Sequence, residues 1–546
     1  MMGTNFHAEY LRELQALDDF LARRRGAERF VEPEDPDVRR LMESLAFFSA
    51  RTREAATAQL RGAIHRVAHG LLDEFVDAQP ARAMLQALPS PRLTEPARLP
   101  RGSRVRLETI DGAVGQFSTM REVTIRPLEI DRAELQLRGS GYRVLLRLRA
   151  HGPIAEIAEP LSIHIDHLGD YEISRQLLGH LVDHLDRVGV VYGDPPGPSE
   201  PGQPCTFSFG TPTHQGAAAM EHSLRSQQRA GAIAKIREFL HFPSKELCVN
   251  LQLAKPARPW RQAWLCLDFD EWPEGQVVNR DMFRLFMVPI ENLFTEPAEP
   301  IKCDGTRTRY PITSWSVDAD VRFHSIVEVQ QELPTGMDVI LPGHLSSSNE
   351  SWELELDDEH GAPQLLLSLP SAFMEPRIVM VRARWYQPRF DEAAFGKLDA
   401  KLHSRHLEGV GLRVHGGLAP SRTSPLHSDP SAMLHVLSRR SKRILSREDI
   451  VKMMTVLGAD AHSYYGEIAG DLRHVEAYDE PADIRSGAGV QHVYQVRCAE
   501  VAPERRGLLD DYLRCLGVLL DEWSNNPARV VKDEPTRRTR RGSAAP

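Results

Sequence analysis

The sequence lacks several features that mark common classes of protein. Its six cysteines stand far apart and never form C-x-x-C, so neither a zinc cluster nor a disulfide framework is indicated. No apolar run approaches the roughly 18 residues of a membrane-spanning helix, and the first residues lack the apolar core of a secretory signal. These absences predict a cytoplasmic chain with reduced thiols and no direct membrane insertion.

The sequence also lacks an excess of positive charge. It holds 67 Lys or Arg against 76 Asp or Glu, a formal net charge of -9. A surface of this sign does not attract nucleic acid or anionic lipid, so no nucleic-acid partner is expected. Only the end of the chain is basic, and we interpret residues 531–546 as a disordered tail carrying Arg537, Arg538, Arg540 and Arg541.

Motifs for nucleotide binding and nucleophilic catalysis are missing as well. Neither a Walker A loop, a G-x-G-x-x-G loop nor a G-x-S-x-G elbow is present, and the glycines after Gly409 have the wrong spacing. We therefore expect no catalytic residue, no cofactor and no resident metal.

One group of histidines leaves an enzymatic alternative open. His180 and His184 lie four residues apart, which places two rings on one face of a helix, and His164 or Asp166 is a candidate third ligand. A metal-dependent hydrolase is therefore the alternative from another class. Against it, the segment lacks the glutamate of H-E-x-x-H, and both histidines flank a leucine stripe, which is typical of structural histidines at a core boundary.

What is present is a long chain with alternating regions of helical and strand periodicity. At roughly 100 to 200 residues per domain, 546 residues predict several domains. We predict a multidomain α+β fold with a helical N-terminal region, a β-rich antiparallel middle, and a mixed and helical C-terminal region. The predicted boundaries are a helical region 1–92, a β-rich region 93–330 with an exposed loop 193–204, a second β-rich region 331–414, a linker 415–431, an α/β region 432–530 and the tail 531–546.

Apolar side chains recur at helical spacing near both ends of the chain. At the N-terminus we predict three helices, the third with a stripe from Leu60 to Phe75. Near the C-terminus a strong stripe runs from Leu508 to Trp523. Such stripes must be buried against something, and partner helices are one way to bury them. The candidate partner-interface residues are Tyr10, Leu14, Leu41, Leu45, Phe48, Tyr512, Leu516, Leu519 and Trp523.

The middle of the chain shows the period of two that half-buried strands require. In residues 142–149, Tyr142, Val144, Leu146 and Leu148 are predicted to face a core, while Arg143, Arg147 and Arg149 face water. This alternation predicts antiparallel strands with one face in solvent.

Several of these segments resemble one family, the type VI secretion system baseplate subunit TssF, also called ImpG or VasA. The helix from Asp35 to Arg51 is similar to the family's DP-x-V-x-R-L-x-E-x-x-A-F-L-x-A-R helix. The most specific matches are central, where Phe239 to Leu247 resembles F-x-x-F-P-E-K-F-L-F and Pro289 to Ile301 resembles P-V-x-N-L-F-x-x-x-A-E-P-I. Beyond about Trp315 the similarity thins.

The resemblance implies a structural wedge component of a contractile injection machine related to phage tails. In such wedges two TssF-like chains combine with one TssG-like chain, and TssK-like and TssE-like subunits dock on them. Six wedges surround the spike hub and carry the sheath, so the implied location is the cytoplasmic baseplate near the inner membrane. A wedge protein of another phage-tail-like contractile system is a further alternative.

Overall fold

The computed structural model describes most of the chain, and its secondary structure is both helical and β-rich. The residues described are 2–23, 35–53, 56, 77–139, 141–197, 200–212, 231–273, 275–316, 320–334, 336–343, 345–347, 349–356, 362–394, 396–403, 407–425, 430–439, 442–481, 489–524 and 526–532. The predicted stripe of the third helix, from Leu60 to Phe75, lies wholly outside them. The multidomain α+β fold predicted from the sequence is confirmed.

The chain divides into two compact units. Unit 1 holds residues 1–73, 298–313 and 328–381, and unit 2 holds residues 74–297, 314–327 and 382–546. The strands β18 (Arg322–Leu333) and β22 (Arg377–Tyr386) each begin in one unit and end in the other. Each unit is described by itself below.

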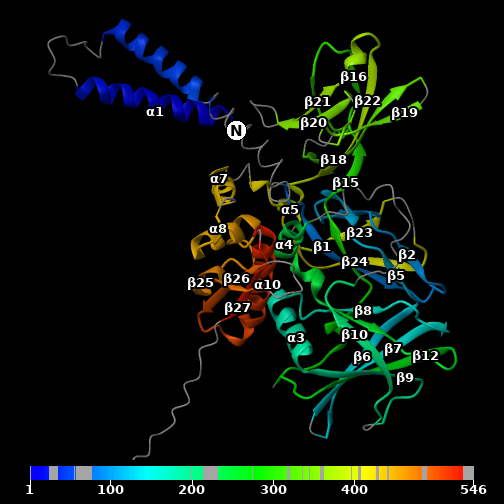
Figure 1. Ribbon diagram of the computed structural model, residues 1–546. Coiled ribbons are helices and arrows are strands. Elements are labelled where there is room, and N and C mark those ends of the chain that lie inside the picture. Colours follow the sequence, from blue (N-terminus) through cyan, green and yellow to red (C-terminus); the bar gives the residue numbers. More distant parts are fainter. Residues whose placement is uncertain are drawn as a thin grey trace, which may run out of the picture. The chain divides into compact units, whose positions relative to one another are not determined.

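The N-terminal helix pair is the first part of unit 1. It consists of α1 (Met2–Arg23) and a second helix at residues 36–53, the two blue helices that lie side by side in Figure 1. The Ser49 hydroxyl donates to the Glu13 carboxylate at 3.0 Å, and the Arg53 guanidinium donates to Glu9 at 3.0 Å. Because position 13 meets 49 while position 9 meets 53, the two helices run antiparallel.

The second part of unit 1, which we call the β module, is formed by residues 298–313 and 328–381. In it, β16 (Ile301–Cys303) pairs with β22, and β19 (Gly336–Ile340) pairs with β18 as a hairpin. A three-stranded antiparallel sheet completes it, with the order β17 (Arg309–Pro311), β21 (Pro363–Ser368) and β20 (Ser351–Leu356). A 3-10 turn, η3 (Pro370–Phe373), precedes β22.

Unit 2 contains a closed barrel of six strands. Its order is β1 (Arg82–Pro89), β14 (Met287–Glu291), β4 (Val114–Thr119), β3 (Arg104–Glu108), β23 (Asp399–Leu402) and β24 (Val410–Ala419). Beside these, β2 (Ala97–Leu99) pairs with β5 (Val123–Ile125), and β15 (Phe294–Pro297) pairs with the end of β22. The short helix α5 (Phe390–Ala393) places the Phe390 ring 5.6 Å from that of Phe117, which is fully buried in β4.

Two strands of this barrel differ from the sequence expectations. β1 lies within the region predicted to be helical, and the last part of β24 lies within the predicted linker 415–431. The two pair along their length, with Leu85 opposite Val414 and Met84 opposite His415. Because most of β1 is buried on both faces, it lacks the alternating pattern by which a half-exposed strand is recognised.

A large antiparallel sheet forms the second β structure of unit 2. Its order is β13 (Phe283–Leu285), β8 (Leu161–Ile165), β11 (Cys248–Gln252), β10 (Gln203–Phe209), β9 (Leu185–Tyr192), β12 (Trp260–Phe269), β7 (Gly141–Ile154) and β6 (Leu128–Arg138). Val144, Leu146 and Leu148 of β7 are buried, as predicted. The predicted loop 193–204 connects β9 to β10, and its described residues are mostly exposed.

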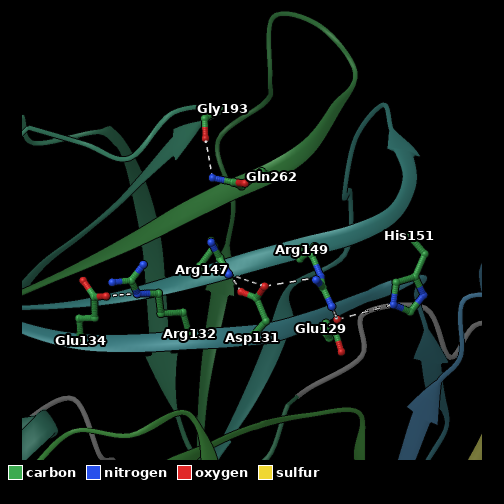
Figure 2. Close-up of polar contacts among 9 residues, drawn as sticks. All are labelled: Glu129, Asp131, Arg132, Glu134, Arg147, Arg149, His151, Gly193 and Gln262. Atoms are coloured by element: carbon green, nitrogen blue, oxygen red, sulfur yellow. Dashed lines mark hydrogen bonds and ion pairs between the residues drawn. The ribbon is translucent and has the colours of Figure 1, made fainter.

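The outward face of β6 and β7 carries a ladder of paired charges (Figure 2). Arg147 forms two hydrogen bonds of 2.7 Å to Asp131, and Arg149 pairs with Glu129 and lies 3.5 Å from Asp131. His151 lies 4.0 Å from Glu129 at the end of the ladder. Positive and negative side chains therefore balance on this face.

Arg143 was predicted to face water together with Arg147 and Arg149, and this prediction is wrong for Arg143. The guanidinium is buried and donates to Asp268 of β12 at 2.6 Å and 3.0 Å. It also donates to the carbonyl of Glu200 at 2.7 Å, in the loop between β9 and β10. The loop and the carboxylate cover a position that strand alternation alone places in water.

The C-terminal part of unit 2 combines helices with a three-stranded sheet, coloured orange to red in Figure 1. The sheet has β26 (Val490–Cys498) at its centre, antiparallel to β25 (Leu472–Pro481) and parallel to β27 (Ala528–Lys532). The helices of this part are α7 (Pro430–Arg439), α8 (Arg447–Leu457), α9 (Ile468–Asp471) and α10 (Pro503–Trp523). The predicted tail begins within β27, and residues 533–546 lie outside the described part of the chain.

Helices from the middle of the chain pack against this C-terminal part. They are α3 (Tyr171–His184), which Asp170 caps, and α4 (Ala232–His241), and both contact α10. The remaining short helices are η1 (Pro243–Glu246) and η2 (Arg280–Met282). Arg175 of α3 forms hydrogen bonds of 2.6 Å and 3.1 Å to Asp511 of α10, so α10 is anchored within unit 2.

Candidate partner-binding surfaces

The helix at residues 36–53 has two apolar faces. Met42, Ala46 and Ala50 are buried and share the face of Ser49 and Arg53, which contact α1. This face closes the antiparallel pair, and the small alanines permit a close approach of the two helices.

The other apolar face of this helix is open. Leu41, Leu45 and Phe48 follow one another at helical spacing and are 61%, 51% and 66% exposed. Among the described residues, these three neighbouring apolar side chains form a contiguous exposed strip on the helix.

α1 contributes two half-buried members of the predicted set. Tyr10 and Leu14 are partly covered. Tyr10 lines a shallow hollow of about 460 Å³ together with Phe47 and Phe48. We call Tyr10, Leu14, Leu41, Leu45 and Phe48 the N-terminal apolar face.

The C-terminal stripe has a different environment. Tyr512, Leu516 and Leu519 are fully buried and Trp523 is nearly so, because α10 packs against α3, α4 and β27 of its own chain. Burial raises the pKa of the Tyr512 hydroxyl far above its usual range. The stripe of α10 is thus covered within unit 2, and these four residues are core in this structure.

A groove of about 780 Å³ lies in unit 2 between the loop after β8, the end of β24 and the loop that precedes α9. His164 lines it and is almost fully buried, and burial lowers its pKa to about 3. Asp166 accepts from Arg284 at 3.2 Å and lies 2.8 Å from His415. Although burial alone would raise the pKa of Asp166, the hydrogen bonds from these two side chains lower it below its usual value.

The metal site built on the histidine cluster does not form. His180 donates to the Glu271 carbonyl at 2.9 Å, and His184 lies 3.0 Å from Asp270, with the centroids of the two stacked rings 4.4 Å apart. They follow Ser174, the last residue of α3 that lines the groove, by roughly 9 Å and 15 Å along the helix, at about 1.5 Å per residue. Within the described part of the chain, no three His, Cys, Asp or Glu side chains are grouped to hold a metal ion.

The structure also exposes apolar side chains that the sequence analysis missed. Met337, Val339 and Leu341 stand about half exposed along β19 and just beyond it, and Phe373 and Met374 are exposed after η3. The available signal was the alternation of apolar residues at every second position from 337 to 341.

None of the helices in the described ranges combines the length and the apolar content that crossing a bilayer requires.

Comparison with solved structures identifies chains that share this fold. A chain in the structure of the type VI secretion system TssK-TssF-TssG baseplate subcomplex superposes with a TM-score of 0.68 and 16% identity, over 91% of this chain and 96% of that one. A chain in the structure of the baseplate complex from the type VI secretion system gives a TM-score of 0.60 at 16% identity, over 95% and 93% of the two chains. At this identity the similarity establishes the fold.

The family follows from the sequence itself. Residues 21–351 match the family described as type VI secretion system, TssF. The chain therefore belongs to the TssF family, as the motif resemblance predicted. A search of curated proteins found no match.

Proposed function

We propose that this chain is a structural subunit of a type VI secretion baseplate and that it acts by binding partner proteins. The observation that carries the proposal is the family match over residues 21–351, joined to a fold shared over nine-tenths of the chain with a subunit of a TssK-TssF-TssG subcomplex. We infer a structural role and not a catalytic one, because the candidate metal ligands are engaged in separate local contacts.

The proposed partners are a TssG-like subunit, with two copies of this chain for each copy of it, and TssK-like and TssE-like subunits. In this account six such wedges surround a spike hub and carry the sheath, in the cytoplasm next to the inner membrane. The large fraction of β structure supplies rigid surfaces, and the N-terminal helix pair supplies an apolar one.

We place the contact with the TssG-like subunit at the N-terminal apolar face. Burying a Leu or Phe side chain stabilises an interface by roughly 1.5–3 kcal/mol, so Leu41, Leu45 and Phe48 together account for several kcal/mol. An amphipathic partner helix laid along the strip is the simplest occupant, since the strip has helical spacing.

The test is co-expression with the TssG-like protein of the same gene cluster, followed by affinity purification through a tag on that protein. The variant Leu41→Gln, Leu45→Gln, Phe48→Gln keeps good helix formers, and we expect it to reduce recovery of this chain at least tenfold. A matched control replaces the exposed residues Ile110, Leu137 and Val277 of unit 2 with Gln and is expected to co-purify normally. If wild-type chain and partner fail to co-purify at any salt concentration, the proposal is wrong.

A further inference from the structure

The net charge of the β module nearly equals the net negative charge of the whole chain. Residues 323–376 contain ten Asp or Glu and no Lys or Arg. The whole module has twelve acidic residues against four basic ones, Lys302, Arg307, Arg309 and Arg377, a net charge of -8 where the complete chain has -9. The remaining residues of the chain are therefore close to neutral.

This charge is not neutralised inside the module. Glu332, Asp338, Glu353 and Glu375 are exposed, and among the residues that the structure describes none of the four forms an ion pair. The nearby cations are committed elsewhere, since Arg309 pairs with Glu355 at 2.9 Å and Arg377 donates to the amide oxygen of Gln331 at 3.1 Å. The paired ladder on β6 and β7 in Figure 2 is the opposite case, because each carboxylate there has a cation beside it.

An apolar row runs through this acidic surface. In the hairpin, Val329 and Ile340 face each other and are buried, so their side of the strands faces the core. Side chains alternate along a strand, which places Met337, Val339 and Leu341 on the outward side. Their exposure confirms that placement.

Exposed carboxylates lie on and next to the hairpin that carries the apolar row. Glu332 lies opposite Met337 in the register, on the same outward side. Asp338 alternates with Met337 and Val339 and therefore lies on the opposite side of the strand, where it is exposed and accepts from the side-chain amide of Gln331 at 3.3 Å. Glu353 follows Trp352, whose indole donates to the Ile340 carbonyl at 2.9 Å and whose backbone N–H donates to Leu341 at 3.2 Å. Glu332 thus shares the outward side of the apolar row, and the strand that carries Glu353 is hydrogen-bonded to the end of β19. We call these exposed carboxylates, Glu332, Asp338, Glu353 and Glu375, the acidic rim.

β19 is also the last strand of its sheet. Edge strands are commonly protected against unwanted pairing by exposed charge, which accounts for some of the carboxylates. Protection against unwanted pairing does not account for the three outward apolar side chains on and just beyond this strand, because exposed apolar side chains favour association at a sheet edge. An apolar centre with a charged rim is the usual composition of a protein interface.

We infer that the hairpin of β18 and β19, with its acidic rim, is a docking surface for a basic protein face on another subunit of the assembly. The partner presents Lys or Arg side chains around an apolar patch, because only that charge complements a rim of one sign. Nucleic acid and anionic lipid are excluded as occupants, since both are negative. The inference rests on the proposed function, which supplies the neighbouring subunits.

The test uses the full chain in its purified complex with the TssG-like subunit, immobilised and titrated with the TssK-like and TssE-like subunits in turn. One variant neutralises the rim with Glu332→Gln, Asp338→Asn, Glu353→Gln and Glu375→Gln. A second breaks the apolar row with Met337→Ser and Val339→Thr. The matched control neutralises four exposed carboxylates of unit 2, with Glu95→Gln, Asp111→Asn, Asp186→Asn and Glu504→Gln.

We expect one of the two subunits to bind wild-type complex with an affinity that falls as salt rises. The rim variant should bind at least tenfold more weakly and should lose most of the salt dependence. The row variant should bind at least fivefold more weakly and should keep its salt dependence. The control should change in affinity by less than twofold. Equal affinities of the rim variant and the control for both subunits would overturn the inference while leaving the proposed function intact. Failure of the wild-type complex to form would instead refute the proposed function.

A synthetic peptide of residues 529–546 tests a competing occupant, the arginine-rich end of a second copy of this chain. The competing occupant is supported if the peptide binds the wild-type chain, does not bind the rim variant and competes with neither subunit. In that case the surface binds the C-terminal segment of a second copy, and the inference of a partner subunit is wrong.

Discussion

Arg143 and Asp268 lie side by side in the interior of the large sheet of unit 2. The guanidinium makes three hydrogen bonds, two to the carboxylate and one to the Glu200 carbonyl. The hydrogen bond to Asp268 is the main cause that raises the pKa of Arg143, so the arginine stays charged while buried. A buried charge with its partner in place is tolerated, whereas the same charge alone is costly.

Removal of one partner should therefore destabilise the chain strongly. We expect Asp268→Ala to lower the free energy of unfolding of unit 2 by about 3–5 kcal/mol, because Arg143 is left buried without a counter-charge. Glu129→Ala removes a partner from the exposed ladder and should cost less than about 1 kcal/mol. Urea unfolding followed by tryptophan fluorescence measures both, and equal effects of the two variants would contradict this account of Arg143.

Two buried histidines make stability depend on pH. Burial lowers the pKa values of His164 and His241 to about 3, from a normal value near 6.5. Because the pKa of each histidine is lower in the folded chain than in the unfolded chain, the unfolded chain binds more protons as the pH falls. The full free energy of folding is therefore available only above about pH 6.5. It falls as the pH drops toward 3.

Between pH 7.5 and pH 5.5 each of these histidines should therefore cost about 1.4 kcal/mol of folding free energy. His241→Gln keeps a donor for the Pro80 carbonyl, which His241 contacts at 2.9 Å, and removes one titrating group. We expect this variant to lose about half of the pH dependence attributable to the pair, measured as the shift of the urea midpoint. An unchanged slope would show that His241 is not buried as described.

At the scale of single elements, two amphipathic helices with similar patterns have different environments. The stripe of α10 is buried by α3, α4 and β27, and the outer stripe of the helix at residues 36–53 is exposed. Periodicity shows that a helix has an apolar face, but the tertiary structure decides whether the chain itself covers that face.

This difference predicts opposite outcomes for matched substitutions. Leu516→Ala should destabilise unit 2 by about 2–5 kcal/mol, because Leu516 is fully buried. Leu45→Gln should leave the free energy of unfolding within about 0.5 kcal/mol of the wild-type value and should weaken only the binding of the TssG-like subunit. A Leu45→Gln protein that unfolds early would mean that the exposed face is needed for folding.

Elements with a strong local pattern could be predicted from the sequence, and elements defined by pairing partners could not. The alternation in β7 identified a strand and its buried side, and the stripe of α10 identified a helix. β1 and the end of β24 were missed because each exists through pairing with a strand more than three hundred residues away. The burial of Arg143 was missed for the same reason, since Asp268 lies 125 residues away in the sequence.

The candidate surfaces divide in the same way. Leu41, Leu45 and Phe48 were predicted from helical spacing and proved to be exposed. Their counterparts Tyr512 and Leu516 share the pattern but lie in the core. The apolar row on β19 escaped notice because a short alternating strand is common, and only its acidic surroundings make it distinctive.

At the scale of the whole molecule, charge and apolar surface are distributed unevenly. The β module holds a net charge of -8 and an exposed apolar row, while the N-terminal helix pair holds an apolar strip with helical spacing. Two surfaces of such different chemistry suit different partners, one basic and one helical. Both surfaces fit the proposal that this chain contacts several proteins at once.

The central claim is that this chain assembles with a TssG-like subunit as part of a baseplate. Native mass spectrometry of the two proteins, co-expressed and purified through the TssG-like subunit, tests it most directly. The account predicts one dominant species with the mass of two copies of this chain and one TssG-like subunit, lost when Leu41, Leu45 and Phe48 are replaced with Gln. A spectrum of separate monomers for the wild-type proteins would contradict it.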